Sequence, residues 1–486
     1  MTRIETPQSR CRFALAWGDI TPPADIYHRM WGAAKHERAT GIHRPLRATA
    51  AVFAPANDTP SAPGAAHPAP QVVLALDHCV LGAEEHRRLL TRLTQVVGLP
   101  EEVFLIVFSH THAAGLMGLE RASLPGGDLI PSYLQRMGER AAELVREALE
   151  KLALVDICYA TGRCNLAAHR DFWDAASQSF VCGFNPAAPA DDTVLVARVT
   201  GSDGAVLATL VNYACHPTTL AWDNSLISPD YIGALREVVE RETKAPCLFL
   251  QGASGELGPV EGYVGDPAVA DRNGRQLAYA ALSALTALPA AGTRFRYTGP
   301  VVSGATLGAW AHEPLAADEL ASKQAWEVAR WSEPLPYRPG LPTAALVEIE
   351  LKRFLSDEDA ARAKGDATQA SECRAMAERK RRLLHRLAQL PPGEKFPLQI
   401  IVWRMGDALW VGVQGELYSV LQTELRRRFP AKAIVVATVA ADWGASYLPP
   451  RDIYGTGIYQ ETIAVVAPGS LERVIESIAA RMQELG

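Results

Sequence analysis

Short apolar runs that end in polar turns recur along this chain of 486 residues, and they limit the folds it can adopt. The runs alternate with longer stretches of helical periodicity. This alternation predicts an α/β (α+β) fold, in which helices cover a mixed β-sheet core. Five runs lead into polar turns, several of which contain glycine: Val103–Phe108, Val206–Val211, Cys247–Leu250, Ala408–Val413 and Ala433–Val439.

The same patterns predict the other elements. Further strands are expected at Val72–Leu76, Val194–Val199, Val347–Leu351 and Leu398–Met405. Ser202-Asp203-Gly204 predicts a hairpin between the strands on either side of it. The expected helices are Glu84–Val97, Tyr133–Leu152, Tyr231–Glu242, Arg272–Leu288, Leu471–Leu485 and a long charged stretch, Asp357–Leu390, that contains Gly365. A Pro-, Ala- and Ser-rich segment, Pro55–Gln71, predicts an exposed loop.

Composition excludes several classes of protein. The chain has 48 Lys and Arg against 54 Asp and Glu, a net charge of −6, which gives no argument for nucleic acid or an anionic membrane as a partner. Its eight cysteines contain no CxxC pair, so a thiolate zinc site is not expected. No apolar run reaches about 18 residues, so no membrane span is expected. Met1–Arg12 has no apolar signal sequence, and we therefore expect a cytoplasmic protein.

The polar turns predict where the chemistry lies. Ligands of such sheets bind beyond the carboxyl ends of parallel strands, so we expect these side chains to converge there as an active site. His110 and His112 share one face of an extended segment, which suits one metal, or a metal ligand beside a proton shuttle. His216 and Glu416 follow other strands. Two histidines and a carboxylate from separate strands form a common zinc set, and zinc with an open position supports hydrolysis.

Each of these residues also has an ordinary structural explanation. The His-x-His pair could be hydrogen-bonded at the surface, and His216 could be a loop histidine before Pro217. Glu416 could cap the helix pattern that follows it. Tyr447 could be a packing residue, and Ser254, in a Gly-Ala-Ser-Gly turn, is not in a nucleophile elbow.

Several short motifs, in order, resemble the neutral/alkaline (non-lysosomal) ceramidase family, specifically its N-terminal zinc amidase domain. The resemblance spans nearly the whole chain. Its motifs are Trp17-Gly18-Asp19-Ile20-Thr21-Pro22-Pro23, Gly41-Ile42-His43-Arg44-Pro45-Leu46, Leu76-Asp77-His78, Ser109-His110-Thr111-His112, Ala214-Cys215-His216-Pro217-Thr218, Ile227-Ser228-Pro229-Asp230-Tyr231-Ile232-Gly233, Gln414-Gly415-Glu416 and Ser446-Tyr447-Leu448-Pro449.

The resemblance implies the roles of individual residues. It implies one Zn²⁺ per chain, held by His110, His216, Glu416 and Tyr447. It also implies that His112, Arg170 and Tyr459, together with Tyr447, contact the scissile group or its product. Asp77 and Asp230 are candidates for orienting the histidines, although capping a helix or turn is an equal alternative for both.

Two departures mark the chain as a divergent member. Gly258 stands where the family has a serine in its Gly-Asp-x-Ser-Pro segment, and Ser254 lies four residues away. Family members also carry a C-terminal β-sandwich and are typically exported, and neither feature is expected here. We therefore predict a single catalytic domain over residues 1–486, with a lid or insertion at about 310–342. These departures favour a soluble substrate over ceramide.

The resulting hypothesis is a zinc-dependent hydrolase that cleaves the amide bond of a small N-acyl compound with a metal-activated water. Three alternatives remain. The same site could act as an esterase or lactonase, or the chain could be a catalytically silent member that binds a ligand. Serine hydrolysis through Ser254 is the third. No acyl group, amine or oligomeric state follows from the sequence.

Overall fold

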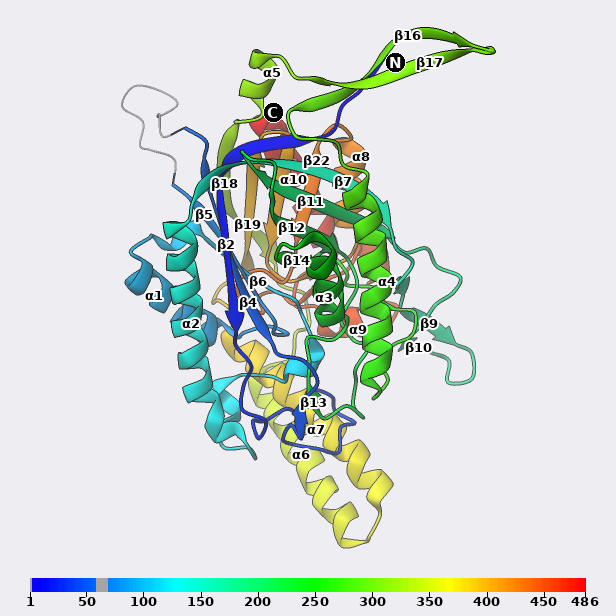
Figure 1. Cartoon of the computed structure of the whole chain (residues 1–486). Helices are drawn as coiled ribbons and strands as arrows, with labels where there is room; N and C mark the ends of the chain where they lie inside the picture. Colours follow the sequence, from blue (N-terminus) through cyan, green and yellow to red (C-terminus); the bar gives the residue numbers. More distant parts are fainter. Residues whose placement is uncertain (1, 58–68) are drawn as a thin grey trace.

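The computed structural model describes residues 2–57 and 69–486. Two β-sheets pack face to face, and helices cover the outer face of each, so the molecule has four layers (Figure 1). The mixed sheet core covered by helices confirms the predicted fold class.

The larger sheet has eight strands and the smaller has four. In spatial order the larger contains β14 (Cys247–Gln251), β12 (Val206–Tyr213), β11 (Thr193–Gly201), β7 (Ala153–Arg163), β2 (Gln8–Asp19), β4 (Arg47–Pro55), β5 (Gln71–Leu76) and β6 (Phe104–Phe108). The smaller contains β18 (Trp326–Pro336), β19 (Lys395–Met405), β20 (Ala408–Val413) and β22 (Ala433–Ala437). The parallel pairs are β12 with β14, β5 with β6 and β20 with β22; the other pairs in these sheets are antiparallel.

Helices cover the two outer faces of the sheets. On the larger sheet lie α1 (Ala83–Val97), α2 (Ile130–Glu150), α3 (Tyr231–Thr243) and α4 (Pro267–Thr286). On the smaller lie α8 (Val420–Arg428) and α10 (Ser470–Leu485). The short helices α5 (Ala317–Ser322) and α9 (Tyr459–Ile463) lie in connections, and α6 (Ala344–Ala363) and α7 (Ala367–Gln389) form a hairpin that projects at the lower end of Figure 1.

Aromatic side chains fill the space between the two sheets. The ring of Phe53 lies 5.0 Å from that of Trp403 and 5.2 Å from that of Trp410, measured between centroids. Every residue of β4 is buried, because this strand has helices on one face and the smaller sheet on the other. A strand covered on both faces is apolar throughout rather than alternating. The shared core fixes the two sheets against each other and thus fixes the ends of their strands.

Most predicted elements are confirmed, including the hairpin of β11 and β12. The strand predicted at Val347–Leu351 is wrong, since these residues belong to α6. Thr343 caps this helix by accepting a hydrogen bond from the Leu346 amide, and the charged stretch that follows continues it. Gly365, at φ 72°, separates α6 from α7.

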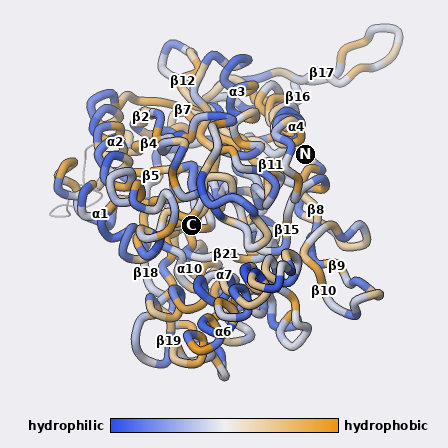
Figure 2. Tube along the Cα trace, turned by 90° about the horizontal axis from the view of Figure 1, so that it is seen from below, coloured by the Kyte–Doolittle hydropathy of each residue, from blue (hydrophilic) through white to orange (hydrophobic). Residues whose placement is uncertain are grey.

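A two-stranded ribbon, β16 (Thr293–Ser303) and β17 (Ala305–Pro314), extends away from the body, and β1 (Arg3–Ile4) pairs with its base (Figure 1). Apolar stretches lie near its far end (Figure 2), and Val302 is 83% exposed. The expected lid region, 310–342, contains the end of β17, α5 and β18, and β18 is an edge strand of the smaller sheet.

Four short strand pairs lie outside the main sheets: β3 (Gly41–Ile42) with β13 (Leu226–Ile227), β8 (Ala167–His169) with β15 (Leu257–Pro259), β9 (Asp171–Asp174) with β10 (Ser179–Cys182), and β21 (Glu416–Leu417) with β23 (Tyr447–Leu448). The loop predicted over Pro55–Gln71 begins at the end of β4 and finishes in β5, and its residues 58–68 lie outside the described part of the chain. None of the helices in the described ranges is long and apolar enough to cross a membrane.

Candidate metal centre and its cavity

Two buried histidines lie just beyond the ends of two strands of the larger sheet. His110 follows β6 and His216 follows β12. His110 has a φ of 67°, an uncommon conformation for a residue with a side chain, which marks positions that the surrounding structure holds in place. Its amide donates to the carbonyl of His78 at 2.9 Å. The backbone therefore aims the imidazole inward.

Backbone carbonyls fix the orientation of both rings. His110 Nδ1 donates to the carbonyl of Cys79 at 2.7 Å, and His216 Nδ1 donates to that of Ser254 at 2.6 Å. With the proton on Nδ1, each ring presents the lone pair of Nε2. This is the usual way in which a second contact orients a metal-binding histidine.

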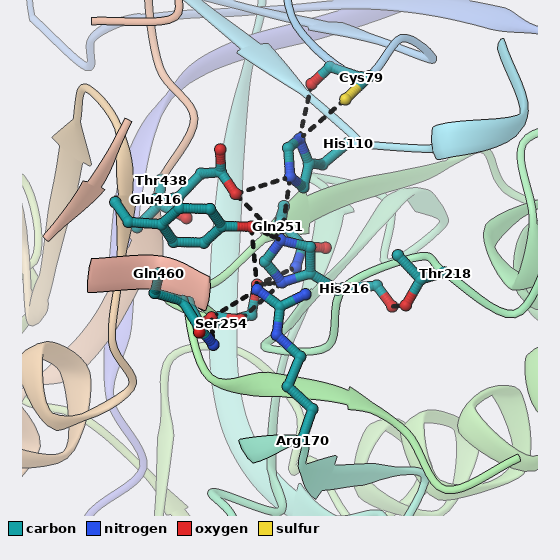
Figure 3. A network of polar contacts seen from close by, with 12 residues as sticks. Cys79, His110, Arg170, His216, Thr218, Gln251, Ser254, Glu416, Thr438 and Gln460 are labelled. Carbon is teal, nitrogen blue, oxygen red and sulfur yellow. Dashed lines mark hydrogen bonds and ion pairs between the residues drawn. The ribbon is translucent and has the colours of Figure 1, made fainter. Parts of the chain in front are cut away.

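The two Nε2 atoms converge on the carboxylate of Glu416 (Figure 3). They lie 3.2 Å from each other, and 3.3 Å (His110) and 3.1 Å (His216) from Glu416 Oε2. All three side chains are buried. Two imidazole nitrogens and a carboxylate oxygen that face one point could hold a metal cation between them, and the set is one that Zn²⁺ accepts. The residues present thus fit the expected metal.

Glu416 and Tyr447 reach this point from one small sheet. They are direct partners in the parallel pair of β21 and β23, and the Glu416 amide donates to the Ser446 carbonyl at 2.7 Å. Gly415 precedes them at φ 95°, where a Cβ would lie 2.8 Å from the Ser446 oxygen. The Tyr447 hydroxyl lies 3.3 Å from His216 Nε2.

Arg170 supports the tyrosine from the opposite side. Its Nη2 donates to the Tyr447 hydroxyl at 2.9 Å and to the Gly255 carbonyl at 2.6 Å (Figure 3). Arg170 is only 3% exposed, and it follows β8, which pairs with β15. The guanidinium therefore has one fixed position beside the proposed ligands.

Electrostatics favours a cation at the centre. Burial, followed by the Arg170 charge, lowers the pKa of His216 to about 3, so its imidazole is neutral. Burial raises the pKa of Glu416, but His110 outweighs this effect and holds that pKa well below its ordinary value. Burial lowers the pKa of His110, whereas Cys79 and Glu416 raise it well above the ordinary value. A positive charge, either a proton on His110 Nε2 or a metal cation in its place, is thus stabilised beside the Glu416 carboxylate.

His112 and Tyr459 complete the set of predicted residues. The His112 ring lies 5.0 Å from that of His110, and the Tyr459 ring lies 5.9 Å from that of Tyr447. His112 Nε2 is buried and has no hydrogen-bond partner among the described residues. The structure therefore brings all seven predicted site residues together at the strand ends, and their catalytic and metal-binding roles remain predictions.

Asp77 and Asp230 do not orient the histidines. Asp77 forms an ion pair with Arg236 and accepts the Arg47 amide at 2.9 Å. Asp230 caps α3 through the Tyr231 amide at 2.6 Å and also accepts the Leu220 amide at 2.9 Å. The orienting role is therefore wrong for both, because carbonyl oxygens already occupy the Nδ1 atoms, and capping is confirmed for Asp230.

A cavity of about 270 Å³ opens beside the centre. None of the residues at 310–342 lines it, so the expected lid does not wall the site; α7 does. Aromatic and aliphatic side chains share the lining with four arginines and one glutamate. They include Met30, Trp31, Tyr263, Leu383, Trp443, Tyr447, Tyr459, Ile463, Arg170, Arg379, Arg382, Arg386 and Glu378.

Sequence reasoning missed the arginines of α7. Arg379, Arg382 and Arg386 are spaced three and four residues apart, which places them on one helix face. That spacing was the available signal. It was hidden because the surrounding stretch is charged on every side.

Two further residues bear on the serine alternative. Ser254 is 3% exposed, accepts a hydrogen bond from Gln251 Nε2 at 2.8 Å, and does not belong to the cavity lining. Its hydroxyl lies at the Nδ1 side of His216, away from the Glu416 carboxylate. At Gly258 a Cβ would lie 3.7 Å from Thr218 Oγ1 and 3.8 Å from Arg170 Cδ, which is ordinary contact. The geometry therefore offers Ser254 no path to a substrate in the cavity.

Neither a family model nor a curated protein matches the sequence. Solved structures do match. A crystal structure of neutral ceramidase from Pseudomonas aeruginosa is 16% identical, with a TM-score of 0.64 over 99% of this chain and 75% of that one. A ceramidase complexed with C2 is 17% identical, with a TM-score of 0.64 over 99% of this chain and 76% of that one. The chain is therefore a divergent protein with the neutral-ceramidase fold, as its motifs predicted.

Proposed function

We propose that this chain is a zinc-dependent hydrolase that cleaves the amide bond of an N-acyl compound. One observation carries the proposal: His110 Nε2, His216 Nε2 and Glu416 Oε2 lie within 3.3 Å of one another, buried, at the side of a cavity. The fold shared with ceramidases, which are amide hydrolases, supports the choice of bond.

The residues that would hold the metal are His110, His216 and Glu416, with Tyr447 as a fourth contact. Zinc, when bound, polarises a carbonyl and lowers the pKa of its water from 15.7 to about 7. The chain contributes the position of the site and its burial. Carbonyls behind both imidazoles keep the ligands in place.

Tyr447 and Arg170 are placed to stabilise negative charge on the substrate. Burial raises the pKa of Tyr447 well above its ordinary value, so the hydroxyl keeps its proton and can donate it. Arg170 holds that hydroxyl at 2.9 Å. We expect the hydroxyl to hydrogen-bond the carbonyl oxygen as charge develops there, which is the role of an oxyanion-hole donor.

His112 is placed to transfer a proton. Burial, with His110 and His216 nearby, holds the pKa of His112 well below its ordinary value, so the imidazole is neutral. Its Nε2 has no partner among the described residues and can take the proton that the attacking water loses. The same proton can then pass to the leaving nitrogen as the C–N bond breaks. Tyr459, at the cavity wall, contacts the substrate or its product in this scheme.

The metal is tested on protein purified without added metal. Elemental analysis should give close to one zinc per chain for the wild type and for His312→Ala, a control on the exposed strand β17. His216→Ala should lose most of the zinc and all measurable amidase activity. Zinc far below one per chain, together with unchanged activity in His216→Ala, would reject the proposal.

The alternatives are separated by substrate and by chelation. Paired amide and ester substrates with the same acyl chain distinguish an amidase from an esterase or lactonase on the same site. Intact zinc with no turnover of amides, esters or lactones would indicate a silent binding protein. Activity that survives chelation but is lost in Ser254→Ala would indicate serine hydrolysis.

A further inference from the structure

Three arginines of α7 form one wall of the cavity. Arg379, Arg382 and Arg386 line it from this helix, and Arg170 lines it from the metal side. Glu378 is the acidic residue of the lining. The cavity is therefore strongly cationic before any metal is counted.

The carboxylate of Glu378 does not neutralise all the arginines that line the cavity, because it is shared among three ion pairs. It forms ion pairs with Arg121 at 3.0 Å, with Arg381 at 2.9 Å and with Arg382 at 2.9 Å. Only the last of these arginines lines the cavity. The other cavity arginines, at positions 170, 379 and 386, form no ion pair with an acidic side chain in the part of the chain that the structure describes.

Arg386 is the clearest case. It is 5% exposed, and its guanidinium stacks on Trp443 at 4.7 Å from the ring centroid. Within the described residues its one hydrogen bond is a long one, 3.5 Å from Nη1 to the Ile463 carbonyl, and its Nε has no partner there. A guanidinium buried without a counter-ion costs several kcal/mol unless an anion completes it.

Arg170, on the other side of the cavity, also has a buried hydrogen-bond donor without a partner among the described residues. It donates through Nη2, whereas its buried Nε has no partner within the described ranges. Two buried guanidinium groups with free donors thus border one small space. Guanidinium donors match a carboxylate well, because the two planar groups can form paired hydrogen bonds.

We infer that the substrate is an amide that carries a carboxylate close to the scissile bond, as an N-acyl amino acid does. This inference rests on the proposed function and specifies its substrate class. The carboxylate binds Arg386, and the α7 wall supplies the surrounding positive charge. The apolar part of the acyl chain packs against Trp31, Leu383 and Ile463.

The size of the cavity agrees with a small substrate. Ligand pockets usually measure about 300–1,000 Å³, and this one, at about 270 Å³, lies just below that range. A short acyl chain with a compact charged group fits it better than a lipid with two long chains. Hydrolysis of N-hexanoylglycine would consume one water and give hexanoate and glycine, with the proton passing to the glycine nitrogen.

Three probes with similar chain lengths test the charge. N-hexanoylglycine carries the carboxylate on the amine side, N-hexylsuccinamic acid carries it on the acyl side, and N-hexanoylethanolamine has a hydroxyl instead. We expect kcat/KM for one of the anionic amides to exceed that for the neutral amide at least tenfold. The anionic probe with the higher kcat/KM shows which side of the scissile bond faces Arg386.

Substitutions of Arg386 test whether this residue causes the preference for anionic over neutral amides. In Arg386→Gln the ratio of anionic to neutral kcat/KM should fall to near one, mainly through KM, and Arg386→Lys should restore part of it. Arg428→Gln, on α8 in an ion pair with Glu476, should keep the wild-type ratio. Equal turnover of all three probes, or a preference that survives in Arg386→Gln, would overturn the inference and leave the proposed function intact.

If no probe is hydrolysed, the binding affinities of the same probes test the anion site. Isothermal titration of the protein as purified should show N-hexanoylglycine or N-hexylsuccinamic acid binding at least tenfold more tightly than N-hexanoylethanolamine. That difference should vanish in Arg386→Gln. Absence of turnover with this difference present would reject the amidase and retain the anion site, whereas equal binding would reject the anion site.

Discussion

Arg170 and Tyr447 are 277 positions apart in the chain, yet Arg170 Nη2 donates to the Tyr447 hydroxyl at 2.9 Å. Both side chains are buried. The arginine reaches the tyrosine from β8 and the tyrosine stands on β23, beside Glu416. This contact sets the direction of a hydroxyl that lies 3.3 Å from His216 Nε2, and it links the candidate metal centre to the cavity.

Removing that hydroxyl should slow the chemical step. We expect Tyr447→Phe to lower kcat about 100-fold, the loss typical of one oxyanion-hole donor, with a smaller change in KM. Zinc should stay bound, since His110, His216 and Glu416 are unchanged. Steady-state kinetics on the best amide substrate and zinc analysis measure the two effects. Tyr279→Phe, on the exposed face of α4, is the control. Wild-type turnover in Tyr447→Phe would show that Tyr447 has no catalytic role.

Asp77 should matter for stability rather than for the metal. Its carboxylate pairs with Arg236, and both side chains are at most 9% exposed. Asp77→Asn leaves this arginine charge buried without a partner, a change that costs about 3–5 kcal/mol. Urea unfolding of this variant should show that loss, while the folded protein keeps one zinc per chain.

A substitution at an exposed aspartate is the control for the stability of Asp77→Asn. Asp318→Asn, in the first turn of α5, should change the free energy of unfolding by less than about 0.5 kcal/mol. If Asp77→Asn lost zinc at full stability, the carboxylate would act on the histidines after all, contrary to its hydrogen bonds here.

Much of the site follows from the sequence because it is local to strand ends. A strand that runs into a turn with His110 or His216 places the ligand, and the shared core of the two sheets brings those turns together. The order of the motifs then identified the fold. The orienting partners could not be predicted in this way, because backbone carbonyls at Cys79 and Ser254 leave no mark on residue identity.

The other differences between the features predicted from the sequence and those observed in the structure also have physical causes. β4 has the sequence Arg-Ala-Thr-Ala-Ala-Val-Phe-Ala-Pro, in which alanines weaken the strand pattern, and burial on both faces removes alternation. Val347–Leu351 alternates over five residues, a length at which the pattern does not separate a strand from one turn of helix. The role of Arg386 depends on which helix face meets the cavity, and tertiary packing decides that.

A serine at position 258 should not be needed. A Cβ there meets only ordinary contacts, so Gly258→Ser should fold, and its loss of stability should not exceed the roughly 1–3 kcal/mol that a buried hydroxyl without a partner costs. Because we assign hydrolysis to the metal site, the new hydroxyl near Arg170 should change amide turnover by no more than a few-fold and leave zinc unchanged. Steady-state kinetics and thermal unfolding are the measurements. If turnover instead rose by two orders of magnitude, the wild type would be shown to lack a catalytic serine.

The ion-pair network around Glu378 should make folding sensitive to acid. Burial raises the pKa of Glu378, but Arg382 and Arg121 outweigh it and lower that pKa to about 2, from an ordinary value of 4.5. A carboxylate with a depressed pKa in the folded state stabilises the protein above its unfolded pKa. The stabilisation is lost as pH falls through the window from about 4.5 to about 2.

Glu378→Gln removes the titrating group and should flatten this dependence. Between pH 6 and pH 3.5 the wild type should lose about 1.4 kcal/mol more stability than the variant, which follows from the two pKa values by linkage. Urea unfolding of both proteins at the two pH values gives the difference directly, and carboxylates common to both cancel in it. At pH 7 the variant should be the less stable protein, because buried Arg121 then keeps, among the described residues, only its ion pair with Glu120. Equal losses between pH 6 and pH 3.5 would mean that Glu378 is not held ionised by the arginines around it.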